Sequence, residues 1–61
     1  MEKLEGSLIG VDSNAFGLMG YFMKQAKRQG WSDVKINEVI KEAESWDYAH
    51  LVLTLNDYFI D

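Results

Sequence analysis

The chain has 61 residues, 48% of them hydrophobic, and a formal net charge of -4, with no cysteine and no proline. At this length we expect one domain over residues 1–61, which buries only about 60% of its unfolded surface and, without disulfides, gains support mainly from self-association. The acidic charge argues against general nucleic-acid binding, because Lys and Arg supply most of that affinity by neutralising phosphates.

The first element that the sequence predicts is a β-strand over residues 3–9, which stops at Gly10. A single strand is not stable alone, because its backbone N–H and C=O groups need partners. With one strand in each chain, the simplest partner is the same strand of a second copy. The strand therefore predicts a two-fold homodimer or a higher homo-oligomer.

Three helices are expected after the strand, and the same pattern marks each start. A polar residue that can cap the helix is preceded by one hydrophobic residue and followed, four residues later, by another, which together form a hydrophobic staple. The three caps, each with its staple pair, are Asp12 with Val11 and Phe16, Ser32 with Trp31 and Ile36, and Asp47 with Trp46 and Leu51.

The ends of the first two helices are also predicted. The first is expected to run to about Gln29, with Gly30 as the left-handed residue that ends it. The second is expected over residues 33–45, because its apolar residues recur at helical spacing. Both helices are short, as is usual in a small domain.

The last segment allows two interpretations. Its apolar residues recur at helical spacing after the Asp47 cap, which favours a helix, whereas the β-branched residues within 51–55 also suit a strand. A strand at 51–55 would pair within the chain and remove the need for a dimer. With the helix preferred, the expected fold class is α+β and mostly helical: one N-terminal strand, paired across a homodimer, followed by three short helices.

Two glycines lie inside the most apolar segment of the chain. Gly17 and Gly20 each cost about 0.5–1 kcal/mol relative to alanine in a helix. The segment is apolar on two faces, which predicts a helix buried on two sides. The glycines therefore serve either close packing against another backbone or the approach of a flat ligand.

The sequence offers two kinds of contact that a nucleotide needs. Three cations within five residues can hold phosphates, and aromatic faces can stack on bases, a contact worth about 1–3 kcal/mol per base. The structural alternatives are that the cations complement a helix dipole and that the aromatic residues form the staples. The residues expected to bind a ligand are Asn14, Phe16, Lys24, Lys27, Arg28, Trp31, Tyr48 and His50.

The sequence lacks the residues that catalysis and metal binding need. No serine lies in a nucleophile motif, and cysteine is absent. His50 is the only histidine, and a metal site needs more nitrogen or sulfur ligands than one. We expect no enzyme activity, no cofactor and no metal, and we expect the His50 ring to pack against Trp46 or Tyr58.

Residues 8–55 carry a familiar pattern. The stretch "GVDSNAFGLMGYFMKQAKRQGWS", followed by "INEVIKEAESWDYAHL", resembles a widespread group of very small proteins encoded by bacteriophages and mobile elements. "NAF", "GW" and "DY.HL" fall in the same order and at matching spacing in that group. The chain departs from it at Ser13 and at Trp46, where the group commonly has glycine.

The resemblance implies an accessory protein that acts in the cytoplasm of the bacterial host. The acidic N-terminus predicts no secretory signal, and the longest apolar run, residues 15–23, is too short to cross a bilayer. The chain is also similar to anti-CBASS sponges, small phage proteins that sequester cyclic-nucleotide immune signals without cleaving them. This similarity implies a homodimer that binds a cyclic dinucleotide or a related signalling nucleotide.

Two alternatives use the acidic residues differently. A protein-binding module would inhibit a host protein through its acidic second and third helices, with contacts at Glu38, Glu42 and Glu44. A small DNA-binding regulator would form a helix-turn-helix around Gly30, which acidic residues such as Asp33 on the recognition helix disfavour.

Overall fold

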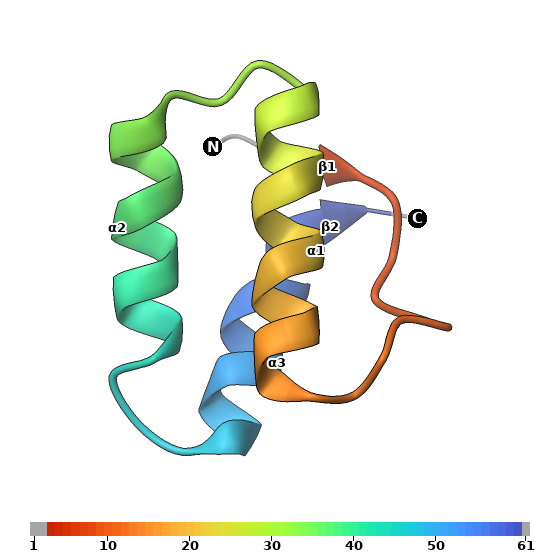
Figure 1. Ribbon diagram of the computed structural model, residues 1–61, viewed down its shortest axis with the longest axis vertical. Helices are drawn as coiled ribbons and strands as arrows, with labels where there is room; N and C mark the ends of the chain where they lie inside the picture. The colour runs from red at the N-terminus through yellow and green to blue at the C-terminus, as the bar shows by residue number, and fades with distance from the viewer. Residues whose placement is uncertain (1–2, 61) are drawn as a thin grey trace.

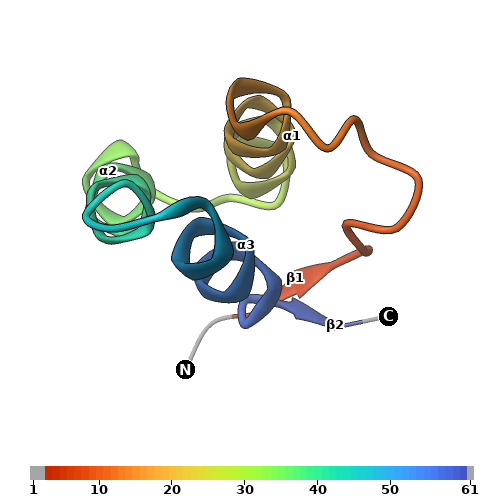
Figure 2. The same cartoon turned by 90° about the horizontal axis from the view of Figure 1, so that it is seen from below.

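The computed structural model describes residues 3–60, which form three helices and two short strands. In chain order these are β1 (Leu4–Glu5), α1 (Ala15–Arg28), α2 (Asp33–Ala43), α3 (Tyr48–Asn56) and β2 (Phe59–Ile60). α1 and α2 run side by side in opposite directions, with α3 behind them (Figure 1). Viewed from below, the strands lie beyond α3, on the side away from α2 (Figure 2). The expected mostly helical α+β fold is confirmed.

α1 begins two residues later than the staple pattern predicts. Its N-cap is Asn14, whose side-chain oxygen accepts hydrogen bonds from the amides of Phe16 at 2.9 Å and Gly17 at 3.3 Å. Asp12 instead accepts from the amide of Asn14 at 3.0 Å, so its carboxylate shapes the turn before the helix. The predicted Asp12 cap is therefore wrong, and the Phe16 side chain, 79% exposed, forms no staple.

The end of α1 follows the prediction closely. Gln29 is the C-cap, and Gly30 has a φ of +92°, the left-handed conformation that a glycine adopts without strain. The amide of Gly30 donates to the carbonyl of Lys27 at 3.1 Å, and the amide of Trp31 donates to that of Ala26 at 2.9 Å. These two bonds form a Schellman motif, which turns the chain so that Trp31 enters the core.

The caps of α2 and α3 are the predicted ones. The Ser32 hydroxyl accepts from the amide of Lys35 at 3.1 Å, and the Asp47 carboxylate accepts from that of His50 at 2.9 Å. α2 ends at Ala43, two residues before the predicted end. Residues 51–55 lie within α3, so the preferred helix is confirmed and the strand interpretation is wrong. Leu51 and Leu55 are buried and Leu53 between them is exposed, which is the spacing of a helix, whereas a strand would bury all three on one face.

The predicted N-terminal strand is much shorter than expected and has its partner within the chain. β1 pairs in parallel with β2, with Leu4 opposite Phe59. The amide of Leu4 donates to the carbonyl of Tyr58 at 2.6 Å, and that of Gly6 to the carbonyl of Ile60 at 3.0 Å. The structure thus replaces the expected pairing across a dimer with pairing to a C-terminal strand that the sequence did not reveal.

The other edge of β1 is also occupied. The side-chain amide of Gln29 accepts from the backbone amide of Glu5 at 2.9 Å and donates to its carbonyl at 3.0 Å. These contacts satisfy the backbone groups of Glu5 that point away from β2. No exposed strand edge remains at this residue to demand a second copy.

The core lies between the three helices and β1. Phe22 is fully buried at its centre, with the rings of Trp31, Tyr58 and Phe59 around it at centroid distances of 5.7, 6.1 and 6.1 Å. Within the single chain α1 buries one face only, with Leu18, Met19, Phe22 and Ala26, so no element within residues 3–60 covers the second face that was expected to be buried. The buried core residues are Leu4, Leu18, Met19, Phe22, Ala26, Trp31, Ile36, Val39, Ala43, Leu51 and Leu55.

Candidate binding surface

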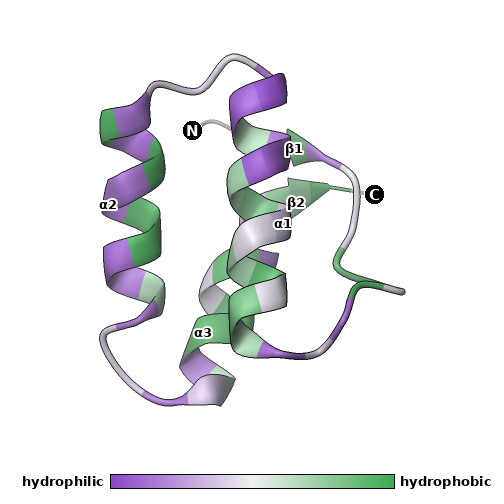
Figure 3. Cartoon of the chain, viewed as in Figure 1, coloured by the Kyte–Doolittle hydropathy of each residue, from purple (hydrophilic) through white to green (hydrophobic). Residues whose placement is uncertain are grey.

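The residues expected to bind a ligand do not converge on one place. Phe16 and Tyr48 lie where α1 and α3 begin, whereas the three cations lie near the other end of α1. Trp31 is 7% exposed and belongs to the core, so it offers no free face for a base. Hydropathy divides α1 in the same way, with a hydrophobic N-terminal half and a hydrophilic C-terminal end (Figure 3).

Three exposed aromatic side chains surround one shallow hollow at the first of these places. We call it the aromatic hollow; its volume is about 280 Å³. Phe16 is 79% exposed, Trp46 78% and Tyr48 48%. The hollow is lined by Ala15, Phe16 and Met19 of α1, by Glu44, Trp46 and Asp47 of the turn after α2, and by Tyr48 and Leu51 of α3.

Local contacts hold the walls of the aromatic hollow in place. The Tyr48 hydroxyl donates to the backbone carbonyl of Ser13, which ties the start of α3 to the loop before α1. The side chain of Asn14 caps α1 and is occupied by that role. Of the predicted residues, only Phe16 and Tyr48 line this hollow.

Trp46 belongs to the aromatic hollow although the sequence assigned it to a staple. Its predicted staple partner, Leu51, is buried at 5% exposure, while the Trp46 ring stays in solvent. The sequence alone does not separate Trp46 from Trp31, which also precedes an N-cap but is buried.

The rim of the aromatic hollow is acidic. Glu44 and Asp47 lie beside the three rings. Within residues 3–60, the one ion pair made by a lysine or arginine joins Lys27 to Asp33, so no such cation pairs with either rim carboxylate. Such a surface attracts a cationic group and repels a phosphate.

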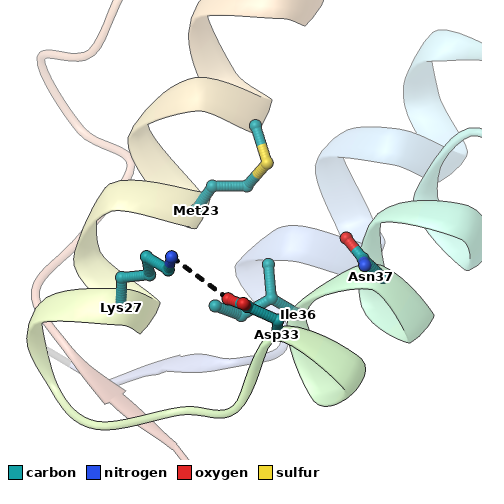
Figure 4. Close-up of a pocket in the computed structure, with 5 residues that line it drawn as sticks. All are labelled: Met23, Lys27, Asp33, Ile36 and Asn37. Carbon is teal, nitrogen blue, oxygen red and sulfur yellow. Dashed lines mark ion pairs between the residues drawn. The ribbon is translucent and has the colours of Figure 1, made fainter.

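A second hollow, which we call the α1–α2 hollow, lies near the other end of α1. It has a volume of about 370 Å³ and is lined by Met23, Lys27, Asp33, Ile36 and Asn37 (Figure 4). The Lys27 ammonium lies 3.2 Å from a carboxylate oxygen of Asp33, and both side chains are largely exposed. The Asp33 carboxylate therefore offsets the positive charge of Lys27, one of the three cations that were expected to hold a phosphate.

The cations and the aromatic rings are well separated along α1. Phe16 and Lys27 are eleven residues apart in this helix, a rise of about 16 Å at about 1.5 Å per residue. Lys24 and Arg28 lie in the same C-terminal half as Lys27. Lys24, the nearest of the three, is eight residues from Phe16, a rise of about 12 Å. A nucleotide stacked in the aromatic hollow would have to span at least this rise for its phosphates to reach one of these three cations.

His50 connects α3 to the end of α2. Its Nε2 atom lies 2.9 Å from a carboxylate oxygen of Glu42, 3.1 Å from the Glu42 carbonyl and 3.3 Å from the Thr54 hydroxyl. The ring also lies 6.0 Å from that of Trp46, which confirms the expected packing. His50 lines neither hollow, and it positions the turn that carries Trp46.

Comparisons with known proteins give no relative. No protein-family model, no curated protein and no solved structure matches this chain. No helix within residues 3–60 is long and apolar enough to span a membrane. In the same part of the chain, no group of three or more acidic, His or Cys side chains is placed to hold a metal ion.

Proposed function

We propose that this protein acts by binding another protein, and that the aromatic hollow is its contact site. The observation that carries the proposal is the gathering of Phe16, Trp46 and Tyr48, all exposed, around one hollow. Tryptophan and tyrosine are among the residues that contribute most to protein interfaces. An aromatic cluster of this kind on the surface of a small protein marks an interaction site.

The charge of the rim indicates the chemistry of the partner. Glu44 and Asp47 flank the aromatic rings, and the chain as a whole carries a net charge of -4. A complementary segment presents an apolar side chain for the hollow and a Lys or Arg next to it for the carboxylates. Given the resemblance to small phage and mobile-element proteins, we propose that this partner is a bacterial host protein.

A nucleotide sponge is the second candidate. The three rings of the aromatic hollow favour it, because exposed aromatic faces stack on bases. The acidic rim and the distance to Lys24, Lys27 and Arg28 count against it, since a cyclic nucleotide carries its phosphates close to its bases. We therefore rank protein binding first.

The experiment is selection of peptides from a displayed random library on the purified protein. We expect the enriched peptides to place Lys or Arg beside an aromatic or aliphatic residue, and we expect Trp46→Ala to weaken their binding at least about tenfold, a loss of roughly 1.4 kcal/mol. Val34→Ala is the matched control, because Val34 is 70% exposed and lines neither hollow.

Two results would contradict protein binding. Enriched peptides that bind Trp46→Ala and wild type equally would place their contact elsewhere. Native mass spectrometry with a panel of cyclic di- and trinucleotides tests the second candidate directly. A bound nucleotide of defined mass, lost in Phe16→Ala, would establish the sponge in its place.

A further inference from the structure

Gly20 has no role in the fold of the single chain. A Cβ atom at Gly17 would meet the Asp12 Cβ at 3.4 Å, so close packing of the preceding loop accounts for that glycine. A Cβ atom at Gly20 would meet nothing within 4 Å. Because glycine weakens a helix relative to alanine, contact with a second molecule is the use that remains for Gly20.

Gly20 lies at the centre of an apolar face that nothing covers. Phe16, Gly20, Met23 and Lys27 follow the spacing that places residues on one side of a helix. Phe16 is 79% exposed and Met23 40%. The glycine leaves a notch between two large side chains, which lets the backbone of another helix come close.

We propose that this face binds the same face of a second copy, with the two α1 helices antiparallel and crossing at Gly20. In such a two-fold pair, Gly20 of one copy lies opposite Gly20 of the other. A residue that follows Gly20 by a given number of positions then lies opposite the residue that precedes Gly20 by the same number in the other copy. Lys24 is therefore level with Phe16 of the second copy. The aromatic end of each α1 meets the basic end of the other.

The charges of α1 and its surroundings match this orientation. The first turn of α1 has no acidic residue and its last turn carries Lys27 and Arg28. The acidic residues Glu44 and Asp47 lie beside Phe16 at the other end, where all three line the aromatic hollow. An antiparallel pair brings the basic end of one copy to the acidic end of the other, twice, and a parallel pair would place like charges together.

The shapes also match. Phe16 of the second copy, level with Lys24, lies next to Met23, which lines the α1–α2 hollow of about 370 Å³ with Ile36 (Figure 4). That hollow can receive a phenylalanine ring, and the symmetry repeats the contact. Self-association of this kind removes the most exposed apolar side chain of α1 from water.

The test is the oligomeric state by sedimentation equilibrium, from micromolar to millimolar concentration. We expect wild type to dimerise and Gly20→Leu to raise the dimer dissociation constant at least about tenfold, because the added side chain blocks close approach. Its melting temperature at low concentration should not fall. Asn56→Leu, which adds the same side chain to an exposed residue of α3, should leave the dissociation constant unchanged.

A charge exchange tests the antiparallel orientation. Lys24→Glu and Glu44→Lys each place like charges across the proposed interface, so each variant alone should dimerise more weakly than wild type. Mixed together, they should form heterodimers, because each new charge then meets its opposite. A wild type that stays monomeric, a dimer unaffected by Gly20→Leu, or a mixture without heterodimers would overturn the proposal. The dimer covers Phe16, so it competes with partner binding at the aromatic hollow. Gly20→Leu and Lys24→Glu change no residue that lines this hollow, so peptide binding by these two variants tests the partner site separately from the dimer.

Discussion

Two tryptophans of this chain occupy the same local position, and only one belongs to the core. Trp31 precedes the N-cap of α2 and Trp46 precedes that of α3. Trp31 is 7% exposed and packs edge-on against Phe22, whereas Trp46 is 78% exposed. Burial separates a residue that stabilises the fold from one that is free to contact a partner.

Substitution should separate the two roles. Trp31→Ala removes a buried ring and should lower the free energy of unfolding by about 3–5 kcal/mol, which is most of the stability of a domain this small. Trp46→Ala should change it by less than about 0.5 kcal/mol. Urea titrations followed by far-UV circular dichroism check both, and equal losses would contradict the roles given to these residues.

The helices are defined at their ends by short hydrogen-bonded motifs. Ser32 and Asp47 cap the helices that the sequence assigned to them. At α1, Asn14 takes the capping role that the sequence analysis gave to Asp12. Asn14 binds two helix amides, and Asp12 binds the amide of Asn14.

This division predicts unequal effects of removing each side chain. Asn14→Ala leaves the first amides of α1 without an acceptor and should cost about 1 kcal/mol of stability. Asp12→Ala removes a contact in the loop only and should cost less. Ser32→Ala, at an undisputed cap, sets the reference for a full capping loss. The ranking is read from urea midpoints, and a larger loss for Asp12→Ala would mean that Asp12 is the effective cap.

For the molecule as a whole, the strand near the start of the described chain pairs with the strand near its end. β1 and β2 come from opposite ends of the described chain, and Gln29, just after α1, binds the free edge of β1. Tyr58 and Phe59, which lead into and begin β2, also pack against Phe22. The last residues therefore hold both the sheet and the aromatic core.

Truncation after Asp57 should abolish cooperative folding. It removes the partner of β1 together with two rings of the core, in a domain with few other supports. The control is Ile60→Ala, which shortens a side chain that is 54% exposed and should change stability by less than about 0.5 kcal/mol. Thermal unfolding by circular dichroism distinguishes them, and a truncated chain that melts cooperatively would show that β2 is dispensable.

The sequence by itself determined the features that depend on residues a few positions apart. The Ser32 and Asp47 caps and the left-handed turn at Gly30 are local, because each satisfies backbone groups within its own helix end. The three-helix, mostly helical fold follows from these signals and from the spacing of apolar residues. Of the aromatic hollow, the sequence identified Phe16 and Tyr48.

Only the tertiary structure decided which side chains are buried and which distant segments pair. The pairing of Leu4 with Phe59, the burial of Trp31 and the exposure of Trp46 depend on contacts between residues far apart in the chain. The separation of Lys27 from Phe16 follows from the length and direction of α1. The physical reason is that capping is satisfied by near neighbours, whereas burial and strand pairing are properties of the packed whole.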